Sequence, residues 1–148
     1  YRIGGRGGDA VFAGTISEQA SGITNLVKQG AGVWTLSGNA AINGDFTVEA
    51  GRLNLGGTLG QIAGKSTIVA DAAMLTLDGT LNSATLRISS GGSLDGQGIV
   101  NGNLENDGLV ELASGSFGVA GKYCPPASAT GDSRHQPTLG RLVVHKHQ

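Results

Sequence analysis

Apolar and polar residues alternate along most of this chain over stretches of four to six positions, and each stretch ends at glycine, asparagine or aspartate. Strict alternation is the signature of half-buried β-strands, and no stretch combines helical apolar spacing with capping residues. The pattern predicts an all-β chain with short strands at Val11–Ile16, Ile23–Val27, Val33–Ser37, Phe46–Glu49, Arg52–Leu55, Ser66–Val69, Met74–Asp78, Thr85–Ser89, Gly98–Val100 and Leu109–Leu112.

Turn-forming pairs separate these candidate strands. Glycine, asparagine and aspartate tolerate the positive φ that tight corners use, which is the role we expect for them here. The pairs are Gly38-Asn39, Asn43-Gly44, Asp78-Gly79, Gly91-Gly92, Asp95-Gly96, Asn101-Gly102 and Asp107-Gly108.

The short strands and frequent turns favour a coiled solenoid over a meander of hairpins. In a parallel β-solenoid each coil hydrogen-bonds to the next at a spacing of about 4.8 Å. Repeats of about 20–25 residues would give roughly five coils, each stabilised mainly by its neighbours.

One phrase recurs three times, a strand that ends in a small residue and glycine and is followed at once by another strand. The copies start at Thr47, Leu86 and Val110. We interpret the Ala-Gly or Ser-Gly as a corner between two faces of one coil. The predicted inward residues are Val48 and Leu53, Ile88 and Leu94, and Leu112 and Phe117.

Composition supports a thin, layered interior. Glycine accounts for 27 of the 148 residues, aromatic residues for 4% and charged residues for 14%. The net charge of −1 is too small to direct the chain to nucleic acid or an anionic membrane. No apolar run of about 18 residues is present that would span a bilayer as a helix. The start at Tyr1, without a signal peptide, suggests a fragment or a mature piece.

The C-terminal segment 124–148 has a different composition. It contains all three prolines, all three histidines and the only cysteine, and Pro125-Pro126 cannot join a central strand. We therefore predict a β-helical domain at 1–123 and an irregular, possibly frame-shifted tail at 124–148. The alternative is a genuine linker or cap, with Leu142-Val143-Val144 as a final strand.

Residues 12–57 resemble the passenger-associated transport repeat of bacterial autotransporters. The matching segments are Phe12–Ile16, Leu26–Asn39 with its lysine before Gly-x-Gly, and Val48–Leu53. Residues 58–121 resemble the looser β-helical region that follows this repeat. The resemblance implies a right-handed, single-stranded parallel β-helix that is secreted and displayed at the bacterial cell surface.

The same resemblance implies a structural role in export-coupled folding and adhesion, with no enzymatic activity, cofactor or metal. The implied partners are an outer-membrane translocation β-barrel, which we expect this chain to lack, and a host surface or neighbouring cells. A β-helical polysaccharide-acting enzyme and a calcium-binding β-roll are the alternative functions.

Candidate sites each have a structural explanation that we favour. Gly4–Phe12 fits one calcium-binding nonapeptide, but a single copy supplies too few oxygen ligands. The acids of a hypothetical carboxylate cluster sit mostly at turns, where aspartate is favoured for local hydrogen bonds. They are Asp71, Asp78, Asp95, Glu105, Asp107 and Glu111.

The remaining candidates are isolated residues. His135, His145 and His147 suit a metal ion only with a fuller ligand set, and Cys124 has no partner cysteine. Trp34 is expected in an apolar layer or end cap rather than as a platform for stacking sugars. No residue is therefore predicted to be catalytic, metal-binding or cofactor-binding.

Overall fold

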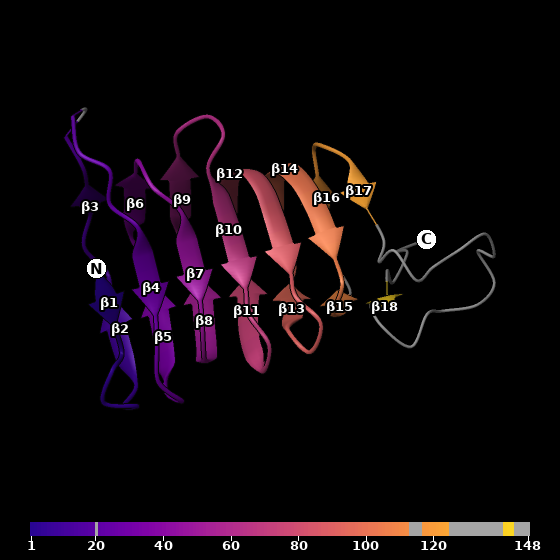
Figure 1. Cartoon of the computed structure of the whole chain (residues 1–148), viewed down its shortest axis with the longest axis horizontal. Coiled ribbons are helices and arrows are strands. Elements are labelled where there is room, and N and C mark those ends of the chain that lie inside the picture. The colour runs from indigo at the N-terminus through magenta and orange to yellow at the C-terminus, as the bar shows by residue number, and fades with distance from the viewer. Residues whose placement is uncertain (20, 113–116, 125–140, 144–148) are drawn as a thin grey trace.

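The computed structural model describes residues 1–19, 21–112, 117–124 and 141–143. The described residues form strands and no helix, and every strand pairing is parallel. Figure 1 shows the strands stacked in rows along one axis, in chain order from the N-terminal end. The predicted all-β parallel solenoid is confirmed, with about five turns.

Each turn of the solenoid contributes one strand to each of three faces, which we call A, B and C. Face A contains β3 (Ile16–Ser17), β6 (Asn39–Ile42), β9 (Thr58–Gln61), the first parts of β12 (Thr80–Ile88) and β14 (Ile99–Asn106), and β16 (Gly118–Val119).

Face B follows face A along the chain. It contains β1 (Arg2–Ile3), β4 (Leu26–Lys28), β7 (Phe46–Val48), β10 (Ser66–Val69), the second parts of β12 and β14, and β17 (Tyr123–Cys124). Because β12 and β14 continue from one face into the next, faces A and B form a single 11-stranded sheet.

Face C is a separate seven-stranded sheet. It contains β2 (Ala10–Phe12), β5 (Val33–Leu36), β8 (Gly51–Leu55), β11 (Ala73–Leu77), β13 (Ser93–Gly96), β15 (Leu109–Leu112) and β18 (Arg141–Val143).

The strand register measures the length of each coil. On face B, Leu26 pairs with Phe46, Phe46 with Thr67, Thr67 with Leu86, and Leu86 with Leu104. Successive coils are therefore offset by about 20 residues, within the range typical of solenoid repeats. The coil length lies near the lower end of the predicted range of about 20–25 residues, because the corners between faces need only a few residues.

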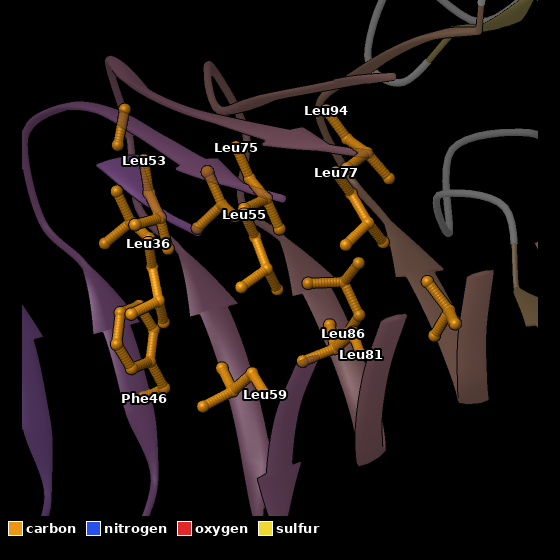
Figure 2. Close-up of a cluster of buried hydrophobic side chains, with 14 of the residues drawn as sticks. Leu36, Phe46, Leu53, Leu55, Leu59, Leu75, Leu77, Leu81, Leu86 and Leu94 are labelled. Carbon is orange, nitrogen blue, oxygen red and sulfur yellow. The ribbon is translucent and has the colours of Figure 1, made fainter. Parts of the chain in front are cut away.

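Alternation along the strands buries a narrow column of apolar side chains. Leu53, Leu75 and Leu94 are register partners on successive coils of face C, and all three are fully buried. Figure 2 shows these leucines stacked beside Phe46, Leu59 and Leu86, which enter the same interior from the other faces. The predicted inward residues Val48, Leu53, Ile88 and Leu94 are all confirmed. Phe117 is half-buried against the core, whereas the side chain of Leu112 lies outside the described part.

Face A is the part of the fold that the strand predictions largely missed. No strand was predicted at β6, at β9 or at the start of β12, and Val11–Ile16 was predicted as one strand where the chain forms β2 and β3 on two different faces. The predicted Asn101-Gly102 turn is also wrong, because these residues lie inside β14, whereas Asp95-Gly96 ends β13 and Gly96 has the positive φ expected at a corner. Asn101-Gly102 instead marks the bend where the pairing of β14 with β12 shifts register.

The glycines between faces C and A have a different role from the predicted one. Among the glycines of the predicted turn pairs, only Gly91 and Gly96 have a positive φ. One glycine of each coil stacks on the glycine of the coil before it at the corner between faces C and A. A Cβ on such a glycine would overlap the backbone carbonyl of the glycine one coil earlier. The column consists of Gly14, Gly38, Gly57, Gly79 and Gly98. Close backbone approach, rather than left-handed geometry, therefore requires glycine at these positions.

The predicted tail is described only in part. Cys124 ends β17, and Arg141–Val143 forms β18, which pairs in parallel with β15 and overlaps the alternative final strand. The other tail residues lie outside the described part, and the boundary at 123 stays a prediction.

Candidate functional site

A buried lysine is the most unusual polar group of the solenoid. Lys28 ends β4, where alternation turns its side chain inward, and only 1% of it is exposed. The register places it in a column whose other members are Ile3, Val48, Val69, Ile88 and Asn106. A lysine therefore occupies a level of the interior at which the adjacent coils carry aliphatic side chains.

The ammonium group of Lys28 is fully engaged by backbone carbonyls. Its Nζ donates to Gln29 O at 2.9 Å, to Gly30 O at 2.8 Å and to Ala50 O at 3.1 Å. The first two acceptors belong to its own corner between faces B and C, and the third belongs to the same corner of the next coil. One side chain thus ties two successive coils together.

Burial and one carboxylate act on this ammonium in opposite directions. Removal from water lowers the pKa of Lys28, whereas the negative charge of Asp9 raises it by a smaller amount. Asp9 is itself held in place, because its Oδ1 accepts a hydrogen bond from Val33 N at 2.7 Å. With all three donors used, the ammonium is suited to binding corners rather than to reacting with a substrate.

The contact of Asp9 with Val33 is one of five hydrogen bonds of the same kind among the residues that the structure describes. In each, an acidic or amide side chain accepts from a backbone N–H about one coil later in the chain. The others join Glu18 to Asn43 N, Asn25 to Asp45 N, Asp45 to Ser66 N and Asn103 to Lys122 N, at 2.8–2.9 Å. Four of these acceptors lie in the first 45 residues and one near the C-terminal end of the stack, and each links its coil to the coil that follows it.

The sequence contained signals for both features, although neither was predicted as functional. Leu26-Val27-Lys28 alternates, so the position of Lys28 two residues after Leu26 already placed it on the inward side. Asn25 and Asp45 directly precede β4 and β7, and their separation in the sequence equals the length of one coil.

The calcium-type nonapeptide forms a turn that supports the next coil. Gly4 and Gly7 have φ of 81° and 72°, and Gly7 N donates to Gly4 O at 3.0 Å. Asp9, the acid of the motif, accepts from Val33 N, and β2 starts at the following residue. This geometry matches the Gly-rich turn that we favoured.

The acidic candidates are distributed over several faces. Asp71, Asp78 and Asp107 lie in turns, and Asp107 forms an ion pair with Arg87 at 3.7 Å. Asp95 and Glu111 are register neighbours on face C, and Glu105 is the register partner of Arg87 on face B. Within the described residues, no group of three His, Cys, Asp or Glu side chains is placed to hold a metal ion.

The other candidates have simple placements. Trp34 is 8% exposed within the core, which matches the expected apolar layer and is incompatible with a sugar-stacking platform. Cys124 is an exposed free thiol, and the three histidines lie outside the described residues. In the part of the chain that the structure describes, no helix is long and apolar enough to cross a membrane.

Comparison with known proteins agrees with this architecture. Residues 26–55, which start with β4 and include Lys28, match the passenger-associated-transport-repeat family. The chain is also 31% identical over 83 residues to the adhesin BmaC autotransporter of Brucella suis biovar 1 (strain 1330). This similarity covers 54% of the chain and 2% of the length of that relative. No solved structure matches the chain.

The repeat match and the autotransporter similarity fall on a parallel β-solenoid in which successive coils are tied at their corners. These findings support a secreted or cell-surface location and suggest a non-enzymatic role. The chain therefore contains a passenger-associated transport repeat at residues 26–55, and the repeat match together with the similarity to an autotransporter adhesin supports an autotransporter passenger domain.

Proposed function

We propose that this chain is a structural passenger segment whose coils fold one upon another during export and thereby help to draw the chain outward. A folded coil offers the next one a complete template, since it presents strand edges on three faces together with corner acceptors such as Asn25 and Asp45. The five hydrogen bonds from later N–H groups to earlier side chains are the observation that carries this proposal.

Sequential stacking also opposes slippage back through a translocation pore. Each added coil buries several large apolar side chains, and a fully buried leucine contributes roughly 1.5–3 kcal/mol relative to an exposed one. Backward movement of the chain would require unstacking the last coil and exposing those side chains to water again. A translocation β-barrel is the proposed partner of this process.

An export assay with a matched pair of substitutions tests the proposal. Residues 1–123 are placed as the passenger of an autotransporter, and surface display is measured by protease accessibility on intact cells. Leu36→Asp puts a charge at a fully buried position of β5, whereas Ser37→Asp puts the same charge at the adjacent exposed position. We expect Leu36→Asp to reduce surface display and Ser37→Asp to leave it unchanged. Equal display of both variants would overturn the role of coil stacking in export.

Adhesion is a second candidate role, favoured by the similarity to a protein named as an adhesin. Its test is attachment of cells that display residues 1–123 to cultured host cells and to one another, compared with cells that display Leu36→Asp at an equal surface level. Attachment that depends on the folded solenoid would support adhesion, and equal attachment of both strains would refute it.

The proposed role is structural rather than enzymatic. Incubation of the purified chain with pectin-like and glucan polysaccharides, with and without calcium, is expected to release no reducing ends. Calorimetric titration with calcium is expected to show no binding heat. Product release would favour the polysaccharide-acting alternative, and saturable calcium heat would favour the β-roll alternative.

A further inference from the structure

The apolar interior alone does not distinguish one coil from another. Val48, Val69 and Ile88 fill the same inward position on three successive coils of face B, and all are fully buried. If a coil skipped its neighbour and stacked on the one beyond, it would bury side chains of similar size and shape. Repetition of this kind leaves register weakly specified unless a polar group discriminates.

The ammonium of Lys28 needs a hydrogen-bond acceptor from the coil that stacks beside it, and the native neighbour supplies one. Its Nζ requires the Ala50 carbonyl, which lies two residues after Val48 in the next coil. One coil further on, the corresponding corner is one residue longer. Two residues separate Val48 from Gly51, which starts β8, whereas three residues separate Val69 from Ala73, which starts β11. Gly51 and Ala73 are register partners, so the extra residue lies in the corner.

The longer corner also has a different backbone course. Ala72 has a φ of 60°, and Ala70 O accepts a hydrogen bond from Ala73 N at 3.1 Å within the same turn. A coil stacked there would therefore leave the Lys28 ammonium without the carbonyl that Ala50 provides. A buried ammonium that loses a hydrogen-bond acceptor raises the free energy of the folded chain. The skipped-coil arrangement would therefore be less stable than the native one.

We propose that Lys28 specifies the register of coil stacking, by allowing the coil that contains β4 to accept only the coil that contains β7. This inference rests on the proposed coil-upon-coil folding, for which a skipped coil would be the characteristic error. Buried polar groups that select register at some expense of stability are known in other repetitive folds.

Disulfide trapping on face B can separate the two registers. Val27, Thr47 and Ile68 face outward and follow one another in register across three coils. A Val27→Cys/Thr47→Cys pair reports the native register, because adjacent strands lie about 4.8 Å apart. A Val27→Cys/Ile68→Cys pair lies about 10 Å apart in the native stack, beyond disulfide reach, and reports a skipped coil. Both pairs are made in a Cys124→Ser background and oxidised after refolding from denaturant.

Lys28→Met is then introduced into each of the two cysteine-pair variants, and the disulfide yields are compared with those of a control substitution. We expect Lys28→Met to raise the yield of the skipped-coil disulfide about tenfold, which corresponds to a lost discrimination of about 1.4 kcal/mol. Lys65→Met removes a half-buried lysine at another corner and is expected to leave that yield unchanged. If Lys28→Met forms only the native disulfide, or neither, the proposal is overturned, because the lysine then contributes to stability and not to the choice of register. The test involves no export, so its failure is distinct from failure of the proposed function.

Discussion

At the scale of single residues, the solenoid depends on a few positions where close backbone contact or a buried charge restricts which residue can be present. Glycines stacked between faces C and A and the buried Lys28 between faces B and C are the clearest examples. The sequence showed that glycine marks corners, but it did not reveal the reason. Positive φ is a local property, whereas contact with a carbonyl one coil away depends on the register of the whole stack.

Two adjacent glycines test the close-contact explanation. Gly57 stacks on Gly38, and a Cβ there would overlap the Gly38 carbonyl, whereas nothing lies within 4 Å of a Cβ at Gly56. Neither residue has a positive φ. We expect Gly57→Ala to lower the free energy of unfolding by about 1–3 kcal/mol and Gly56→Ala to change it by less than about 0.5 kcal/mol. Urea unfolding followed by circular dichroism measures both, and equal effects would contradict the explanation.

The buried ammonium predicts a pH dependence. Because the pKa of Lys28 is lower in the folded chain than its ordinary value of 10.5, the unfolded chain binds more protons between the two values. Folding stability from this group must therefore rise as the pH increases through that interval. We expect the free energy of unfolding of the original chain to rise, relative to that of Lys28→Met, as the pH is raised towards 10.5. A difference between the two chains that stays constant or shrinks over this range would show that the folded pKa is not lowered.

At the scale of elements, the sequence predicted the strands in the middle of faces B and C better than those of face A, although no strand was predicted at β1, at β13, at β17 or at the second part of β14. Strands such as β8 and β11 contain two or more large apolar residues in alternation, and that signal is visible locally. The strands β6 and β9 are rich in small and polar residues, with Ala40 and Ile42 or Leu59 alone pointing inward. Their pairing with strands one coil away supplies the order that their own sequences do not show.

The element β9 offers a direct check of face A. Leu59 is fully buried, whereas Thr58 beside it faces outward. We expect Leu59→Ala to destabilise the chain by about 2–5 kcal/mol because it leaves a cavity. Thr58→Ala is expected to cost under about 1 kcal/mol. If both substitutions had small effects in chemical denaturation, Leu59 would not belong to the core.

The candidate site was also predictable only in part. A lysine at an inward position of β4 could be read from alternation, and the transport repeat could be recognised from its motif. The contact of Lys28 with Ala50 O could not be predicted from the sequence, because it forms only when the coil of β7 stacks on that of β4. Asn101-Gly102 shows the opposite error, because this residue pair is typical of turns but lies inside β14, where Asn101 pairs with Asn82 of β12.

At the scale of the whole molecule, the chain is a stack in which each coil depends on its neighbours. The three continuous faces and the apolar column extend from one coil to the next. The contact of Lys28 with Ala50 O and the five side-chain contacts to later N–H groups join neighbouring coils. This organisation connects the similarity to autotransporter passengers with the proposed function, since a chain that leaves a pore gradually can fold one coil at a time.

The most direct test of the stack is a series of distances along one outward row of face B. Val27, Thr47, Ile68, Arg87 and Glu105 are successive register partners. Spin labels at Val27 and at Ile68, Arg87 or Glu105, measured by electron paramagnetic resonance, should give backbone separations that grow by about 4.8 Å per coil, to about 19 Å for the last pair. Clearly larger steps, as in an antiparallel meander in which the intervening strands lie between these residues, or separations that do not increase in this order would contradict the parallel solenoid.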